Sequence, residues 1–176
     1  MAEKQRRNDS IAYATARDPG QPDAWTAESQ GRGSQRLTEV SEVAPPQEVA
    51  TALAMTPDEK AVVRRRAVLL NDDVIELADS YYPLSVARGT ALAEKRKIKG
   101  GAPTLLASLG YRATRLVEDV ELREAHEAEC AALALPAGSN VLTLLRATAG
   151  EDGTPYEVQF MVMKAPRRLH YEIEVD

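Results

Sequence analysis

The chain has 176 residues, of which 44% are hydrophobic and 28% are charged. These values are typical of one globular domain, with or without a tail. The 22 basic and 27 acidic side chains give a net charge of −5, which excludes a chain-wide basic surface for nucleic acid. The single cysteine, Cys130, excludes an internal disulfide and a metal site built from several cysteines.

Signals for a membrane or for secretion are missing from the sequence. No apolar run approaches the roughly 18 residues of a transmembrane helix, and no apolar segment follows the charged N-terminus as in a secretory signal. The sequence therefore predicts a cytoplasmic protein with no membrane partner.

The first part of the chain has neither a helical nor a strand period. It is polar and interrupted by glycine and proline, so it cannot bury enough apolar surface to order itself. We expect a linker-like, partly disordered tail over residues 1–36 and a folded domain over residues 37–176. Trp25 is the exception in this tail, and we expect it to dock against the folded body; a binding role is the alternative.

From residue 47 on, the chain runs through a sequence of elements that occurs twice. Apolar spacing and turn residues predict a helix, a strand, a turn and a second strand. In the first copy these are residues 47–55, 61–70, 71–73 and 74–82. In the second copy, about eighty positions later, they are residues 132–135, 141–147, 150–153 and 154–163, which makes a weak internal repeat.

The segments between and after the repeats complete the predicted fold. Residues 92–97 form a charged helical stretch, and a further helix has Pro103 in its first turn and Gly110 at its C-terminal end. Residues 114–123 and 169–175 alternate between apolar and polar, as strands with one wet face do. Together these elements predict an α+β fold, an antiparallel sheet of about six strands with flanking helices.

Motifs for common enzyme chemistry are absent from the sequence. It contains no glycine-rich phosphate loop, no zinc-protease motif and no nucleophile elbow. We expect His126 to open a helix, His170 to be exposed and Cys130 to be a small core residue. These absences disfavour a hydrolase or a metalloenzyme, and we expect no enzyme, no catalytic residue, no metal site and no cofactor.

Three consecutive arginines lie in the middle of the predicted strand over residues 61–70. Because strand side chains alternate, Arg64 and Arg66 share one face and Arg65 has the other. Two guanidiniums on one partly apolar face are suited to clamping a carboxylate or phosphate. The alternative is a solvated face, or ion pairs to Glu76 and Asp79.

The second hairpin offers a simpler interpretation of its charges. A four-residue turn over residues 150–153 places Arg146 opposite Glu157, which predicts a cross-strand ion pair. Met161 and Met163 share a face with Glu157. We expect them to fill the core, and an adaptable pocket wall is the alternative.

The ordered set of these segments resembles the UTRA domain, the effector-binding half of GntR-type transcription regulators of the HutC subfamily. The resemblance covers residues 37–176 and implies the fold of chorismate lyase. The first hairpin carries it in Val62-Val63-Arg64-Arg65-Arg66 and Asp79-Ser80-Tyr81-Tyr82-Pro83. The second hairpin carries it in Ala132-Leu133, Val141, Arg146 and Asp152-Gly153-Thr154-Pro155-Tyr156-Glu157-Val158. Two earlier segments are similar to the interdomain linker of such regulators, Trp25-Thr26-Ala27-Glu28 and Arg32-Gly33.

The resemblance implies a pocket on the sheet for a small, often anionic effector. The implied effector-binding residues are Arg64, Arg66, Glu76 and Glu157, with the loop Gly100, Gly101 and Ala102 at the start of the central helix. This loop lacks the hydroxyl residues of sugar-phosphate binders, but a helix N-terminus holds anions through its backbone N–H groups. Lys164-Ala165-Pro166-Arg167-Arg168 departs from the Gly-Asp-Arg that ends the corresponding strand in full regulators.

The resemblance implies an effector-sensing and dimerisation domain that forms a homodimer. The winged helix-turn-helix of a full regulator is missing from this sequence, so we expect contact with DNA only through such a domain, which this chain lacks. Two alternatives stay open. The first is an enzyme that eliminates pyruvate from an aryl enolpyruvyl ether, as on the chorismate lyase fold, and the second is a dimerisation partner that modulates full-length repressors.

Overall fold

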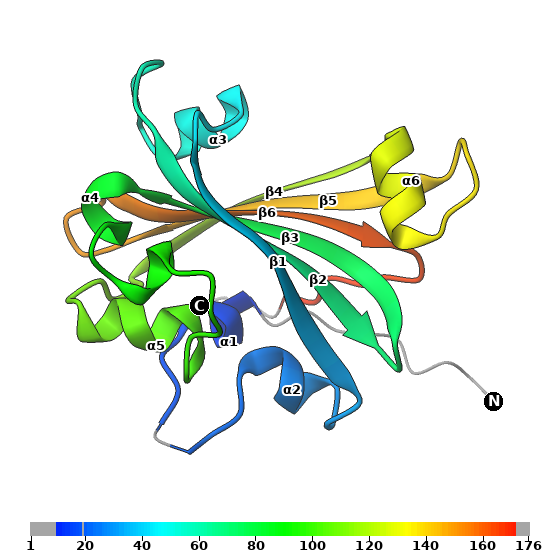
Figure 1. The fold of residues 1–176 in the computed structure, drawn as a ribbon, viewed down its shortest axis with the longest axis horizontal. Coiled ribbons are helices and arrows are strands. Elements are labelled where there is room, and N and C mark those ends of the chain that lie inside the picture. The colour runs from blue at the N-terminus through cyan, green and yellow to red at the C-terminus, as the bar shows by residue number, and fades with distance from the viewer. Residues whose placement is uncertain (1–9, 19, 172–176) are drawn as a thin grey trace, which may run out of the picture.

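A computed structural model describes residues 10–18 and 20–171 of the chain. Its centre is one antiparallel sheet of six strands in the order β1-β2-β3-β6-β5-β4 (Figure 1). The strands are β1 (Gly33–Val43), β2 (Ala61–Leu70), β3 (Asp73–Pro83), β4 (Arg115–Glu124), β5 (Asn140–Ala149) and β6 (Pro155–Lys164). The helices are α1 (Ser10–Ala14), α2 (Ala24–Glu28), α3 (Gln47–Ala52), α4 (Leu84–Ala87), the 3-10 turn η1 (Ala91–Ala93), α5 (Gly101–Ser108) and α6 (Glu127–Leu133).

The predicted fold class is confirmed, because the sheet is antiparallel, has six strands and is flanked by helices. The two repeated hairpins, β2–β3 and β5–β6, join at the centre of the sheet through the pairing of β3 with β6. Five strands begin and end within two residues of their predicted ends. Only the C-terminal end of β5 differs by as much as two residues. The shared hairpin pattern thus explains the symmetry of the sheet about its central pair.

Membership of the sheet differs from the prediction at both ends of the chain. Strand β1 lies in and beyond the segment predicted to be linker, and it pairs with β2 along its length. Residues 169–171 form no strand, and the rest of the strand predicted over 169–175 lies outside the described residues. Leu169 packs against the core cluster around Trp25, so its apolar side chain is accommodated without a strand.

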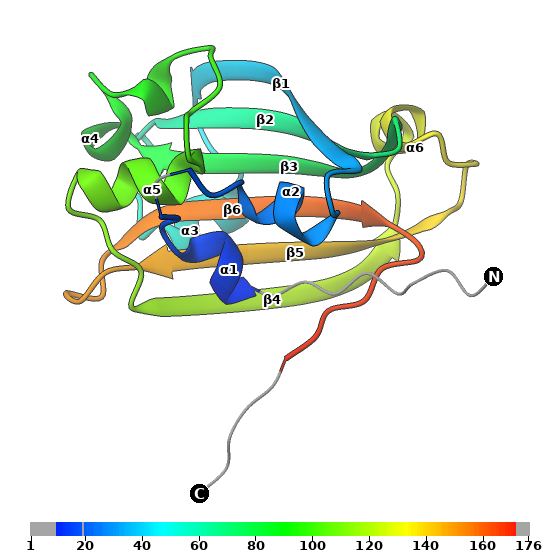
Figure 2. The same ribbon diagram turned by 90° about the horizontal axis from the view of Figure 1, so that it is seen from below.

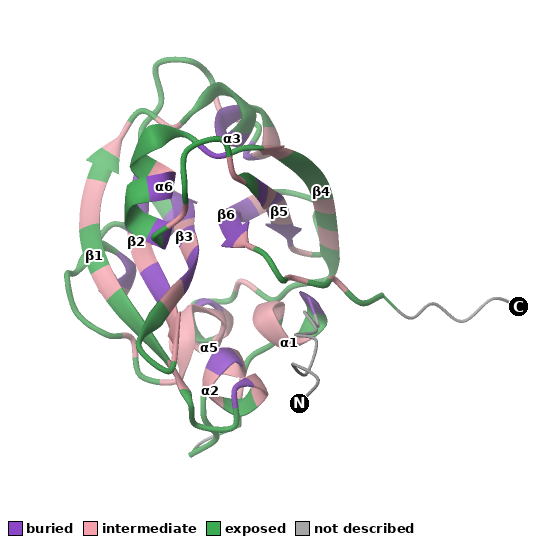
Figure 3. Cartoon of the chain, turned by 90° about the vertical axis from the view of Figure 1, so that its right-hand side faces the viewer, coloured by how far each residue is buried: buried purple, intermediate pink, exposed green. Residues whose placement is uncertain are grey.

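Alternation along β2 divides its side chains between the two faces of the sheet. Val62 packs with residues from α4, η1 and α5, whereas Ala61 and Val63 pack with residues from α3. Figure 2 shows α1, α2 and α5 together in front of one face. Figure 3 shows buried residues along the inner strands of the sheet, whereas the edge strands β1 and β4 carry intermediate and exposed residues.

Helix α5 begins and ends where its proline and glycine predict. Pro103 lies in the first turn of α5, where its missing N–H costs nothing, and Gly110 follows the C-cap residue with φ of +94°. The predicted helix over 92–97 is reduced to η1, and residues 94–97 are not helical. None of the helices in the described part of the chain is long and apolar enough to cross a membrane.

Trp25 docks against the sheet, as predicted. Its side chain is 3% exposed, and its indole Nε1 donates a hydrogen bond to the carbonyl of Leu69 at 3.1 Å. It packs in a cluster with residues from β2, β3, β5 and β6. The close approach of the indole to β1 requires a glycine, because a Cβ at Gly33 would overlap the ring.

We expect Gly33→Ala to displace Trp25 and to lower the free energy of unfolding by about 1–3 kcal/mol, the usual effect of overpacking. Because the chain has one tryptophan, its fluorescence emission reports the displacement directly as a red shift. Thermal unfolding and emission spectra check both effects. Ser34→Ala, at the adjacent exposed position, is the control, and a wild-type midpoint with unshifted emission for Gly33→Ala would contradict the packing described here.

Candidate functional site

An open cavity of about 550 Å³ lies between the sheet, the start of α5 and the chain segment before α2. Arg64 and Arg66 of β2 and Ser80 and Tyr82 of β3 form its floor. Its other walls are contributed by residues 21–26, by the start of β1 and by residues 97–102. Three parts of the chain that are distant in sequence therefore meet at one hollow.

Arg66 contributes the guanidinium whose charge is left without a carboxylate partner. Its Nη2 donates to Ser80 Oγ at 2.7 Å, and its Nη1 donates to Gln35 Oε1 at 3.2 Å. Its Nε is buried and has no hydrogen-bond partner among the described residues. All these partners are neutral, so the positive charge of Arg66 is available to a ligand in the cavity.

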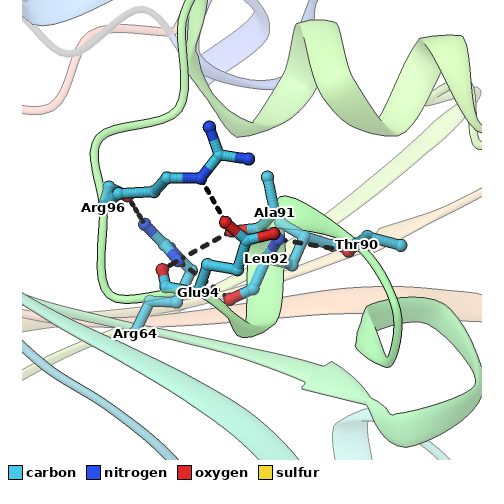
Figure 4. Close-up of polar contacts among 6 residues, drawn as sticks. All are labelled: Arg64, Thr90, Ala91, Leu92, Glu94 and Arg96. Carbon is cyan, nitrogen blue, oxygen red and sulfur yellow. Dashed lines mark hydrogen bonds and ion pairs between the residues drawn. The ribbon is translucent and has the colours of Figure 1, made fainter.

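Arg64 is used differently, although it lies on the same face and lines the same cavity. Its Nη1 donates to the carbonyls of Ala91, Leu92 and Glu94 at 3.2, 2.8 and 2.8 Å, and its Nη2 donates to the carbonyl of Arg96 at 2.8 Å (Figure 4). Burial lowers the pKa of its guanidinium. Arg64 therefore positions the loop over residues 91–96.

These contacts also explain why residues 94–97 are not helical. In a helix, each carbonyl accepts a hydrogen bond from the N–H four residues later. Here the carbonyls of Glu94 and Arg96 accept from the Arg64 guanidinium instead. Local charge and spacing favoured a helix, and a tertiary contact from β2 overrides them.

Arg65 lies on the opposite face of β2, as the strand alternation predicted. It forms ion pairs with Asp79, directly opposite on β3, and with Glu39 of β1 at 3.1 Å. Burial raises the pKa of the Asp79 carboxyl, and the Arg65 charge opposes this shift. The alternative in which Arg64 and Arg66 form ion pairs with Glu76 and Asp79 is therefore wrong, because Asp79 pairs with Arg65 on the other face and Glu76 pairs with Arg167.

Glu76 lies in a smaller chamber of about 90 Å³ beside the open cavity. Its Oε2 accepts a hydrogen bond from Arg167 Nη2 at 3.3 Å, and its side chain is 10% exposed. Burial raises the pKa of the Glu76 carboxyl, while the charge of Arg167 acts against the rise. Arg66 lines both hollows, so the structure brings Glu76 next to the predicted arginine site.

Glu157 does not line either hollow. It is 2% exposed, and its Oε1 accepts hydrogen bonds from Tyr82 at 2.7 Å and from Gln159 Nε2 at 3.1 Å. Because Tyr82 is part of the cavity floor, Glu157 supports that floor from the neighbouring strand, β6, on the same face of the sheet. Its effect on a ligand would pass through the tyrosine hydroxyl.

The predicted ion pair between Arg146 and Glu157 is wrong. Arg146 lies opposite Gln159, and its Nε donates instead to Glu118 Oε1 at 2.5 Å across β4. The prediction paired Ala149 with the residue before Pro155, whereas Ala149 pairs with Pro155 itself and an irregularity follows at once. These two one-residue changes move the register by two positions and keep the face unchanged.

The predicted loop of Gly100, Gly101 and Ala102 lies on the wall of the open cavity. Gly100 has φ of +79°, a left-handed conformation that glycine adopts without strain, and it is the N-cap of α5. No side chain caps this helix end. The Thr104 hydroxyl donates to the carbonyl of Gly100 at 2.7 Å and accepts the N–H of Arg17 at 3.1 Å, which ties the N-terminal segment to the loop.

The remaining candidate residues have structural positions. His126 is the N-cap of α6, and Cys130 is buried in the cluster between α6 and the sheet. His170 is exposed, and Met161 and Met163 are buried in the Trp25 cluster. Among residues 10–18 and 20–171, no group of His, Cys, Asp or Glu side chains is placed to hold a metal ion.

Sequence reasoning missed residues that come from the two ends of the chain. Asp23 and Thr26 line the open cavity, and Arg167 lines the inner chamber. Asp23 carries an N-cap signal, because its carboxylate accepts the N–H of Thr26 at 2.9 Å. That signal predicts a helix start, and only the tertiary structure places the helix over the sheet.

The chain resembles known proteins in sequence and in fold. The family model of the UTRA domain matches residues 29–167. The chain belongs to the UTRA domain family. A comparison with curated protein sequences finds no match.

Solved structures share the fold of this chain. The ligand-binding domain of a protein assigned to the GntR family of transcriptional regulators, from Bordetella bronchiseptica, is 24% identical, with a TM-score of 0.70 over 83% of this chain and 90% of that chain. A second protein assigned to the GntR-family regulators is 22% identical, with a TM-score of 0.81 over 100% of this chain and 72% of that one. The effector domain of PhnF from Mycobacterium smegmatis is 15% identical, with a TM-score of 0.72 over 86% and 95%. At these identities the likeness supports the shared fold.

We expect Arg64→Ala to lower the free energy of unfolding by at least about 2 kcal/mol, because carbonyls of the loop over 91–96 lose a charged donor. Hydrogen exchange should show the loss of protection concentrated in that loop, and chemical denaturation gives its size. Arg88→Ala is the matched control, since Arg88 forms an exposed ion pair with Glu42 at 2.8 Å. Such pairs contribute about 0–1 kcal/mol. Equal stability of the two variants would contradict the positioning role of Arg64.

Proposed function

We propose that this UTRA domain senses a small effector that carries an anionic group, and that the anion binds in the open cavity at Arg66. The observation that carries the proposal is the partly buried guanidinium of Arg66, whose described hydrogen-bond acceptors are all neutral. An anion there would receive charged hydrogen bonds in a setting where they are strong. The interpretation of this chain as an effector-binding domain of GntR-type regulators rests on its family and its fold.

The charges of the cavity wall support an anionic ligand. Lys97, Lys99, Arg64 and Arg66 line the cavity, against one acidic residue, Asp23. This local excess of positive charge contrasts with the overall charge of −5. A cleft lined by one sign of charge raises the local concentration of the oppositely charged ligand.

The N-terminus of α5 supports the same orientation. Its first residues face the cavity, and the helix leaves backbone N–H groups without intrahelical acceptors at that end. Arg66 and the residues Gly101 and Ala102 line both the cavity and the inner chamber, so they lie on a shared boundary. We propose that the anion binds between them, with Arg64 holding the adjoining loop in place.

The placement of the carboxylates supports binding over catalysis. An elimination that releases pyruvate would need a carboxyl group in the cavity to assist the transfer of a proton. Glu157 does not line the cavity and accepts a hydrogen bond from Tyr82, and Glu76 is paired with Arg167 in the inner chamber. Asp23 is the one acidic residue of the cavity wall, and it caps α2. We therefore favour a non-enzymatic domain.

Sensing requires that the ligand contact a part of the chain able to transmit its presence. Residues 21–26 form one wall of the cavity and continue into α2, which packs on β1 through Trp25. This segment is similar to the interdomain linker of GntR-type regulators. We propose that a winged-helix domain attached through such a linker would make the contact with DNA.

Self-association is the second part of the proposed function, and strand β4 supports it. It is an edge strand, paired on one side with β5, and it exposes Val117, Val120 and Leu122. The other edge, β1, carries mostly polar exposed side chains, which natural edges use to avoid pairing. We propose that two copies of the chain meet through their β4 strands, which gives an isologous homodimer.

We expect Arg66→Ala to weaken the binding of inorganic phosphate by about ten- to a hundredfold, the equivalent of one charged hydrogen bond. Isothermal titration calorimetry with phosphate measures the dissociation constants. Arg36→Ala removes the same charge from the neighbouring strand, at an exposed position outside the cavity, and should leave the affinity unchanged. Equal affinity of Arg66→Ala and the unmodified protein would contradict an anion site at Arg66.

We expect the protein to have a mass near twice 19.2 kDa by light scattering at tens of micromolar. Leu122→Lys, at a side chain that is 68% exposed, should give the monomer mass with an unchanged circular dichroism spectrum. Leu109→Lys, at an exposed leucine beside α5, is the control and should stay dimeric. A monomeric unmodified protein, or a dimeric Leu122→Lys, would contradict the proposed interface.

A further inference from the structure

The inner chamber has its own set of polar walls. It lies beneath Trp25 and Tyr13 and is lined by Arg66, Glu76 and Arg167. The lining also includes apolar residues, among them Val68, Ala78, Pro103 and Met161, and the further polar residues Asp23, Gln35, Arg146 and Gln159. A hollow with apolar walls and a few convergent polar groups is the usual form of a ligand subsite.

Two guanidinium nitrogens of this lining are buried without a hydrogen-bond partner among the described residues. They are Arg66 Nε and Arg167 Nη1. The other nitrogens of Arg167 are used, because Nη2 donates to Glu76 Oε2 at 3.3 Å and Nε lies 3.2 Å from the Met163 sulfur. The Arg167 side chain is 5% exposed. A buried charged donor left unpaired is costly, and such groups in native proteins have a reason.

We propose that the inner chamber is a second subsite of the same effector and that it binds a carboxylate through Arg66 Nε and Arg167 Nη1. This proposal rests on the proposed function, since the first anionic group of the effector occupies the open cavity. The ligand class is therefore a short molecule with an anionic group at each end. Arg66, which lines both hollows, lies between the two groups.

The size of the chamber limits the end group to a small one. Its volume of about 90 Å³ corresponds to about three water molecules, at roughly 30 Å³ each in the liquid. A carboxylate with an adjoining methylene fits this space, whereas a sugar or aromatic ring does not. The larger cavity outside holds the rest of the ligand.

The charges of the lining favour an acid over a neutral group. Arg146 is paired with Glu118, and Arg167 is paired with Glu76. Asp23 also lines the chamber, and its carboxylate accepts hydrogen bonds from Thr26. Arg66 has no carboxylate partner, because its described partners are Gln35 and Ser80. A bound carboxylate would give Arg66 Nε and Arg167 Nη1 a charged acceptor, which a neutral group does not supply.

Arg167 supplies a buried guanidinium to the wall of the chamber from the segment that follows β6. Arg167 is therefore a specificity-determining residue for the second end of the ligand.

The test uses the fluorescence of Trp25, the single tryptophan, which lines the chamber. The full chain is titrated with succinate, glutarate and adipate, and with butyrate, pentanoate and hexanoate as partners of matched length. At least one dicarboxylate should bind at least about tenfold more tightly than its monocarboxylate, the gain of one charged hydrogen bond. Succinamate, which replaces one carboxylate of succinate by a neutral amide, separates charge from shape.

Arg167→Gln should abolish the preference for the dicarboxylate and leave the affinity for the monocarboxylate unchanged. Arg168→Gln removes the same charge at the next, exposed residue and should keep the preference. Arg167→Gln leaves Glu76 unpaired and can fail to fold for that reason. In that case the double variant Glu76→Gln/Arg167→Gln, which removes both charges, takes the place of Arg167→Gln in the titration.

The outcomes separate the two proposals. Three results overturn the second subsite alone, provided that phosphate still binds and depends on Arg66. They are no preference for a dicarboxylate, a preference that survives in the folded Arg167 variant, and equal affinity for succinate and succinamate. Failure of phosphate and of all the carboxylates to bind overturns the proposed function as well. A preference that is lost with Arg167 and kept with the Arg168 control supports the subsite.

Discussion

The hydrogen bonds from Arg64 to four backbone carbonyls are the interaction on which the cavity depends. The loop over residues 91–96 has no regular secondary structure after η1, so its carbonyls need donors from elsewhere. A guanidinium can supply several donors in one plane from one side chain. Because Arg64 comes from the central part of β2, the same contact fixes the loop relative to the sheet and sets where α5 begins.

The same interaction explains how two arginines of one strand acquire different roles. Strand alternation correctly predicted that Arg64 and Arg66 share a face and that Arg65 has the other. It could not separate Arg64 from Arg66, because both have the same parity. The separation depends on which residue lies under the loop and which lies beside Ser80 and Gln35, and those neighbours come from other strands and from a non-helical segment.

The limits of the sequence prediction elsewhere have a similar physical origin. Hairpins with local turns were predictable, since their pairing is fixed by neighbouring residues. Strand β1 was missed because an edge strand carries polar side chains, like a linker. The ion pair of Arg146 was assigned to the wrong partner, because a one-residue offset at Ala149 and an irregularity beside it together shift the register by two positions without changing the face. Glu76 shares the inner chamber with Arg66 but not with Arg64, and Arg167 reaches Glu76 only through the fold of the chain after β6.

The N-terminal segment is held to the sheet by the same kind of polar contacts that shape the two hollows. Ser10 donates to Glu118 at 3.0 Å and accepts from Arg146 at 3.2 Å, and Tyr13 donates to Glu28 at 2.5 Å. These contacts surround the inner chamber, whose wall includes Tyr13 and Arg146. Segments from β2, from the end of β6 and from the N-terminal region therefore share one electrostatic environment.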